Sequence, residues 1–194
     1  MQDSRAHGRR TLLIVAAIFL LPVAVAFTLY YGKLWRPANS SNLGELIEPA
    51  RPLTVTGLRH VDGTPAGADV LTGKWTLLYI GDGRCDAACR TALVFARQSR
   101  LALNNEMTRV QRVFLATGNC CANDYFAAEH PGLIALDASS SEAAALLAQF
   151  PAARENSLFI VDPNGNLMMR HDASHTTKDL LSDLKKLLKL SHIG

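Results

Sequence analysis

Four cysteines stand in two close pairs, so thiol chemistry is the first function that the sequence indicates. Cys85 and Cys89 are separated by three residues, whereas Cys120 and Cys121 are adjacent. Thiolates are the nucleophiles of disulfide exchange and soft ligands for Cu(I). A chain of 194 residues is long enough to fold without covalent staples. Chemistry therefore explains the first pair better than stability does.

The first pair is expected at the beginning of a helix. If that helix begins at Asp86, Cys85 lies at its cap and Cys89 one turn further, so both thiols face the same side. Partial positive charge at a helix N-terminus favours a thiolate at Cys85. The preceding loop, residues 81–84, indicates an exposed position. The pair can then exchange a disulfide with a partner or hold Cu(I); the alternative is an inert disulfide or simple apolar packing.

The second pair lies in a loop that follows another predicted strand. Because the ends of neighbouring central strands lie close together, we expect this loop to approach Cys85. Cys120 and Cys121 then have three chemical roles open to them: a vicinal disulfide, a set of resolving thiols, or a sulfur-rich metal site with Cys85 and Cys89. The structural alternative is that one of the two is buried and the other incidental.

The N-terminal part of the chain predicts a membrane anchor. Residues 11–31 carry no charge and are long enough to span a hydrocarbon core. Arginines precede the segment and aromatic residues follow it, which favours a cytoplasmic tail at 1–10 and a periplasmic domain. This places the protein in the inner (cytoplasmic) membrane with a single pass. A signal peptide cleaved after Ala24–Ala26 is the alternative.

Strand and helix patterns alternate after the anchor. Residues 32–52, rich in Pro, Asn and Ser towards their C-terminal part, are expected to be a linker, followed by a domain at 53–194. Strands are expected at 53–56, 75–80, 110–117, 133–136, 157–161 and 166–170. Helices are expected at 86–105, from the cap residues 139–142 to about 150, and at 177–190. This order predicts an α/β thioredoxin-like fold: a central sheet flanked by helices.

These elements and motifs resemble the Sco/SenC family of copper chaperones for cytochrome c oxidase. The matching pieces are the single anchor, the run Leu71–Gly81 leading into Cys85-x-x-x-Cys89, and the hairpin turn at Val161–Gly165. The resemblance implies Cu(I) as ligand and cytochrome c oxidase subunits or assembly factors as partners. Family members bind copper through both cysteines and a histidine, which falls near Arg154 here, where no histidine occurs. The chain therefore resembles an atypical member of the family.

Six histidines occur, and a surface role is the expectation for each. His130 is the first candidate to replace the missing ligand because it follows the second cysteine loop. His171, just after the hairpin, is the second.

Three functions compete at this point. The first is an oxidase-assembly factor that handles copper or keeps the copper-site cysteines reduced. The second is a general thiol–disulfide oxidoreductase, which would make the protein an enzyme, and the third is a non-catalytic scaffold of a respiratory complex. Nucleic-acid binding is excluded, because the net charge is only +3 and no basic stripe with interleaved aromatics occurs.

Overall fold

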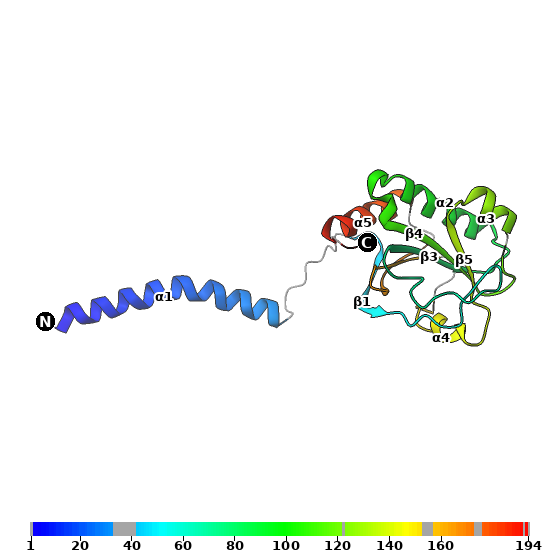
Figure 1. Ribbon diagram of the computed structural model, residues 1–194. Coiled ribbons are helices and arrows are strands. Elements are labelled where there is room, and N and C mark those ends of the chain that lie inside the picture. The colour runs from blue at the N-terminus through cyan, green and yellow to red at the C-terminus, as the bar shows by residue number, and fades with distance from the viewer. Residues whose placement is uncertain are drawn as a thin grey trace. The chain divides into compact units, whose positions relative to one another are not determined.

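The computed structural model describes residues 2–32, 42–121, 123–152, 157–172, 176–191 and 193. Residue contacts divide the chain into two units, Met1–Ser41 and Asn42–Gly194. The first contains helix α1 (Gln2–Tyr31), and the second is built around a β-sheet (Figure 1).

Helix α1 contains the predicted apolar segment. Over His7–Tyr31 its mean hydropathy is 2.8, and no other helix among the described residues is long and apolar enough to cross a membrane. Pro22 lies inside the helix without ending it. The segment is therefore helical over a membrane-spanning length.

Within the described part of the second unit, seven strands form one mixed sheet in the order β1-β7-β6-β3-β4-β5-β2. Their bounds are β1 Glu45–Pro52, β2 Arg59–His60, β3 Trp75–Gly81, β4 Val110–Ala116, β5 Leu133–Asp137, β6 Leu158–Val161 and β7 Asn166–His171. Strands β3, β4 and β5 are parallel, while β6 and β7 form the predicted antiparallel hairpin. Strand β3 is buried along nearly its whole length, as expected for a central strand covered on both faces.

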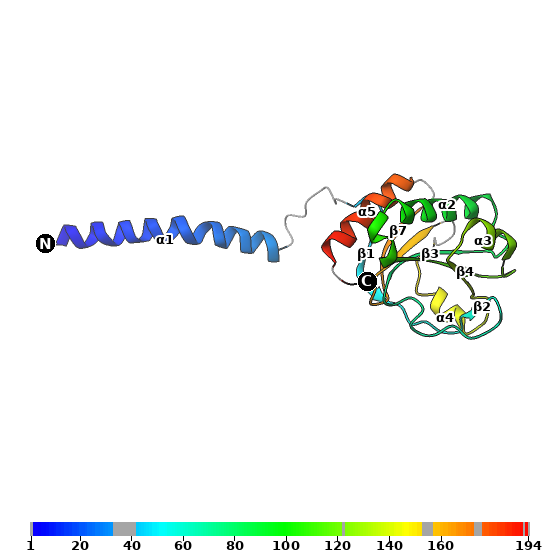
Figure 2. The ribbon, with the colours of Figure 1, turned by 45° about the horizontal axis from the view of Figure 1, so that its top comes forward.

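Helices cover both faces of this sheet. α2 (Ala87–Leu101), α3 (Asn123–Glu129) and α5 (Thr177–Leu190) lie on one face, and the short α4 (Ala143–Leu147) lies on the other (Figures 1 and 2). The side chains of β3 alternate between two apolar clusters: Tyr79 joins the cluster under α2 and α5, and Ile80 joins the one under α4. The predicted α/β layering is confirmed.

The N-terminal edge of the sheet corrects two predictions. Strand β1 lies inside the segment 32–52 predicted as a linker, and residues 53–56 form no strand. β1 pairs with β7 at the edge of the sheet, where Pro49 and Pro52 cost little because edge strands tolerate missing N–H donors. Most of its side chains are exposed, so it lacks the apolar alternation that marks a strand in sequence.

Two helical predictions also change, and one helix was missed. The helix expected over 86–105 ends at Leu101, and a 3₁₀ helix (Asn104–Arg109) follows. Asn104 has a φ of 50° in the left-handed region, so the α-helix cannot continue through this residue. α4 ends at Leu147, short of the expected 150, and α3 was not predicted. α5 has the expected bounds, and a capping box between Thr176 and Asp179 begins it.

A buried carboxylate ties the beginning of the domain to α5. Asp183 is 1% exposed, and its carboxylate accepts hydrogen bonds from the backbone N–H groups of Leu43 (2.9 Å) and Gly44 (2.8 Å). Nε2 of the buried His171 lies 3.3 Å from the same carboxylate, and Nζ of Lys186 lies 3.4 Å away. Because a buried charge is costly without partners, these contacts fix where the chain enters the domain.

We expect Asp183→Asn to lower the free energy of unfolding by about 2–4 kcal/mol. The substitution removes the negative charge that faces both His171 and the two backbone N–H donors. Urea denaturation of the detergent-solubilised chain, followed by tryptophan fluorescence, measures the loss. Lys186→Met is the matched control: its half-exposed ammonium contributes no more than about 1 kcal/mol. Equal losses in the two variants would contradict the anchoring role of Asp183.

Candidate functional site

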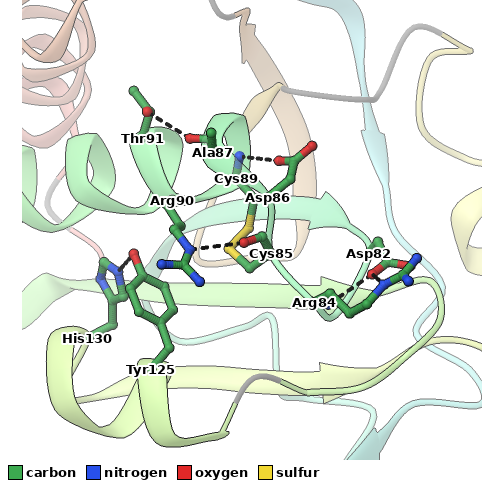
Figure 3. The surroundings of a disulfide bond; sticks show 10 residues. All are labelled: Asp82, Arg84, Cys85, Asp86, Ala87, Cys89, Arg90, Thr91, Tyr125 and His130. Carbon is green, nitrogen blue, oxygen red and sulfur yellow. Dashed lines mark hydrogen bonds and ion pairs between the residues drawn. A yellow bond between two sulfur atoms is a disulfide. The ribbon is translucent and has the colours of Figure 1, made fainter.

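The first cysteine pair lies where the chain passes from β3 into α2. Cys85 and Cys89 are joined in a disulfide, with their Cα atoms 5.1 Å apart. Asp86 is the N-cap of α2, and its carboxylate accepts the backbone N–H of Cys89 at 2.9 Å (Figure 3). Both cysteines lie at the beginning of α2 as predicted, but the cap is Asp86, so Cys85 lies one residue before the cap and Cys89 lies in the first turn.

The exposure predicted for this pair is wrong. Cys85 and Cys89 are 1% and 3% exposed and belong to the apolar cluster between α2 and the sheet. The polar loop before Cys85 does lie at the surface, but Cys85 has a φ of 51°, so the backbone turns at this residue. A glycine- and charge-rich loop therefore does not show which way the cysteine after it points.

An arginine, a tyrosine and a histidine stand beside the disulfide. Nε of Arg90 donates to the carbonyl of Cys85 at 3.2 Å, and its guanidinium lies 4.5 Å from the ring centroid of Tyr125 (Figure 3). The Tyr125 hydroxyl is 3.0 Å from Nε2 of His130. On reduction of the disulfide, this cation and the N-terminus of α2 favour a thiolate at Cys85.

Burial shifts the pKa values of both rings in this group. Desolvation raises the pKa of Tyr125, partly opposed by the nearby Arg90 charge. Desolvation lowers the pKa of His130 below 6.5, and Arg112 and Arg97 lower it further. Both groups are therefore neutral at pH 7, and the positive charge beside the cysteines belongs to Arg90.

The second cysteine loop lies against the first. Cys120 and Cys121 are joined as a vicinal disulfide, with Cys120 exposed and Cys121 half-buried. The backbone N–H of Gly83 donates to Gly118 O at 2.8 Å, and the side-chain amide of Asn119 donates to Asp82 at 2.7 Å. The predicted approach of this loop to the Cys85 loop is confirmed.

Asp82 holds the two loops together as an ion. Hydrogen bonds from the Arg84 backbone N–H, then from the Asn119 and Arg84 side chains, lower its pKa to about 2. Gly83 next to it has no room for a side chain, because a Cβ would overlap the carbonyl of Asn119 and lie 2.7 Å from Cys120 Cα. The loops are thus packed backbone to backbone.

The histidines proposed as substitute copper ligands are engaged elsewhere. His130 faces Tyr125, and His171 faces Asp183. Among the described residues, no group of three His, Cys, Asp or Glu side chains is arranged to hold a metal ion. Arg154, where the resemblance places the family histidine, lies outside the described residues.

An apolar pocket of about 270 Å³ adjoins the helix that carries Cys89. Ala88, Ala92 and Phe95 of α2 line one side, with Leu158 and Leu180 among the residues opposite. The first turns of α2 therefore present the disulfide to the core on one side and an open apolar surface on another.

A family model described as "Transmembrane-like, thioredoxin-like, C-terminal domain" matches residues 75–191, which include β3, both cysteine loops and α5. The chain belongs to this family. Comparison with curated protein sequences finds no significant match. The thioredoxin-like fold predicted from the sequence is confirmed.

Solved structures of Sco proteins share the fold of this family member. Apo Sco1 of Thermus thermophilus is 22% identical, with a TM-score of 0.61, over 78% of this chain and 99% of that one. Yeast Sco1 with copper bound is 16% identical, with a TM-score of 0.60, over 78% and 95%. BsSco, a member of the Sco family of cytochrome c oxidase assembly proteins with a disulfide switch, is 18% identical, with a TM-score of 0.54, over 76% and 99%. The predicted resemblance is confirmed at the level of the fold.

Two parts of the site carry no clear signal in the sequence. The contact of Arg90 with Tyr125 joins α2 to α3, a helix that was not predicted, and the bond of Asn119 to Asp82 joins two loops. Asp82 and Arg90 stand out in sequence only as charges near the cysteines. The contact partners of these two residues can be identified only once the pairing of β3 with β4 is known.

The lowered pKa of His130 predicts acid sensitivity. Below pH 6.5 the unfolded chain binds a proton that folded His130 does not, so stability falls as the pH drops from 6.5 to the folded pKa, by at most about 1.4 kcal/mol per pH unit. We expect His130→Gln to be less stable at neutral pH but to lose less on acidification. Urea denaturation at several pH values measures this.

Tyr125→Phe is the control for that experiment, since it removes the hydroxyl partner and keeps the imidazole. It should retain the wild-type fall of stability with acid. An unchanged pH slope in His130→Gln would contradict the assignment to this histidine.

Proposed function

We propose that this protein is a membrane-anchored thiol–disulfide protein that assists cytochrome c oxidase assembly, with Cys85 and Cys89 as the working pair. The observation that carries the proposal is the Cys85–Cys89 disulfide at the N-terminus of α2, directly after the central strand of a fold shared with Sco proteins. Its work would be to reduce the cysteines of a copper site or to handle copper itself.

The redox role rests on the surroundings of the pair. Arg90 binds the Cys85 carbonyl and both cysteines lie at the N-terminal end of α2, so a released thiolate lies near positive charge. A stabilised thiolate at Cys85 is available at pH 7 as the attacking nucleophile when the dithiol form donates two electrons to a partner disulfide. This supports an oxidoreductase activity directed at a protein substrate.

Copper handling is the second candidate, favoured by the donor chemistry. Once reduced, Cys85 and Cys89 offer two soft sulfur ligands from neighbouring turns, which suits Cu(I). Copper is bound in the yeast Sco1 structure of the same fold. We propose Cys120 and Cys121, on the adjoining loop, as further sulfur ligands in place of the family histidine.

The proposed location is supported by α1. Its length and hydropathy suit a single membrane span, and the arginines before it favour a cytoplasmic N-terminus. We therefore propose that the sheet domain lies on the periplasmic side of the inner membrane. A membrane-impermeant maleimide should label a cysteine placed at Thr54, outside the cytoplasm, but not a cysteine added at the cytoplasmic N-terminus.

The fully reduced chain in detergent should bind Cu(I) in competition with a chromophoric chelator, and glutathione buffers should give a measurable midpoint potential for Cys85–Cys89. The variant with both Cys85→Ser and Cys89→Ser should lose both properties. Serine at Cys120 and Cys121 should weaken Cu(I) binding by about tenfold, since a ligand atom is lost.

Thr91→Ala, an exposed position on the same helix, is the matched control and should change neither property. A measurable midpoint potential for Cys85–Cys89 in a chain that does not bind Cu(I) would favour the reductase function over copper handling. The absence of both, with normal cytochrome c oxidase activity in membranes that contain the double-serine variant, contradicts the proposal and leaves a scaffold role.

A further inference from the structure

The two disulfides differ in how far a protein reductant can reach them. Cys85 and Cys89 are 1% and 3% exposed, whereas Cys120 lies at the surface. Disulfide exchange requires a thiolate to approach one sulfur in line with the bond, and access controls its rate. A large partner therefore meets the Cys120 sulfur before it meets either sulfur of the buried pair.

The exposed pair also lies next to the buried one. Gly83, two residues before Cys85, packs against the backbone of Cys120, and its N–H group binds the Gly118 carbonyl. The half-buried Cys121 packs on the same apolar cluster that contains Cys85 and Cys89. One disulfide therefore faces solvent while its inner cysteine borders the core around the other.

We infer that Cys120–Cys121 is a shuttle disulfide that passes electrons from an external protein dithiol to Cys85–Cys89. This inference rests on the proposed redox role of the buried pair and names how that pair exchanges electrons. Cys120 and Cys121 would then have a redox function when no metal is bound.

The transfer has two balanced stages. In the first, a thiolate of the external dithiol attacks Cys120 Sγ and releases Cys121 as a thiolate; the second external thiol then resolves the mixed disulfide, which leaves an oxidised partner and reduced Cys120 and Cys121. In the second, the Cys121 thiolate attacks Cys85 Sγ and releases Cys89. Cys120 then attacks Cys121, re-forms their disulfide and releases Cys85. Two electrons and two protons pass from the partner to Cys85 and Cys89.

Cys121 and Cys85 are assigned as the exchanging pair because of their positions. Cys121 is the inner member of its pair, and Cys85 belongs to the loop that packs against residues 118–120. The backbone N–H of Cys89, one turn into α2, donates to the Asp86 carboxylate, and Cys89 is the leaving group at the helix N-terminus.

The first test follows the redox state of each pair in the oxidised full-length chain in detergent, by differential alkylation and mass spectrometry. Reduced thioredoxin is the protein dithiol, and tris(carboxyethyl)phosphine is the small reductant. With thioredoxin, Cys120 and Cys121 should be alkylated before Cys85 and Cys89. In the Cys120→Ser, Cys121→Ser variant, reduction of Cys85–Cys89 by thioredoxin should slow by about tenfold or more, while reduction by the phosphine should keep its rate.

Wild-type rates with thioredoxin in that variant would overturn the shuttle and leave the proposed redox role intact. A Cys85–Cys89 bond that neither reductant opens in the folded wild-type chain would overturn the proposed function itself. The two failures are thus distinguishable.

The second test traps the intermediate. The Cys89→Ser, Cys120→Ser variant retains only Cys85 and Cys121, and mild oxidation should join them in one intramolecular disulfide. The matched Cys85→Ser, Cys120→Ser variant retains Cys89 and Cys121 and should join them more slowly. No Cys85–Cys121 disulfide in a folded variant, checked by circular dichroism, would overturn the assignment.

Discussion

The parallel pairing of β3 with β4 is the constraint on which the candidate site depends. The two strands are in register from Trp75 opposite Val110 to Gly81 opposite Ala116, so they end side by side. The Thr117 N–H group extends the pairing by one bond to Gly81 O, at 2.9 Å. Because parallel strands finish at the same edge, both loops that carry cysteines leave the sheet together. Asp82, Asn119 and the glycines then hold those loops in contact.

Burial gives the Cys85–Cys89 disulfide two roles at once. Its sulfur atoms pack as apolar groups under α2, and they also lie at the positive end of that helix beside Arg90. Reduction would leave ionisable thiols in this core, and Arg90 is the side chain placed to stabilise a thiolate there. The contact of Arg90 with Tyr125 holds α3 and the His130 turn over the site, so the redox group and the helix packing are part of one network.

The central part of the fold was predictable because its signals are local. Strand β3 is a continuous apolar run, and α5 has both a capping box and an amphipathic pattern. Strand β1 was missed because an exposed edge strand with two prolines shows neither alternation nor strand propensity. The position of Cys85 and Cys89 on the helix was predictable from their spacing, but their burial was not, since it depends on the left-handed backbone at Cys85. Contacts such as that between Asn119 and Asp82 arise only from the strand pairing.

The anchorage at Asp183 has a mechanical consequence. The chain enters the domain at Leu43 and Gly44, whose N–H groups are held by a carboxylate buried beneath α5, and β1 begins at the next residue. A pulling force from the N-terminal side therefore loads Asp183 before it reaches the hydrogen bonds between β1 and β7. Those bonds can be broken one at a time from the strand end, whereas the carboxylate shares the load over both N–H groups, His171 and α5. The contacts of Asp183 would therefore bear the tension, and β3 and the cysteine loops would not.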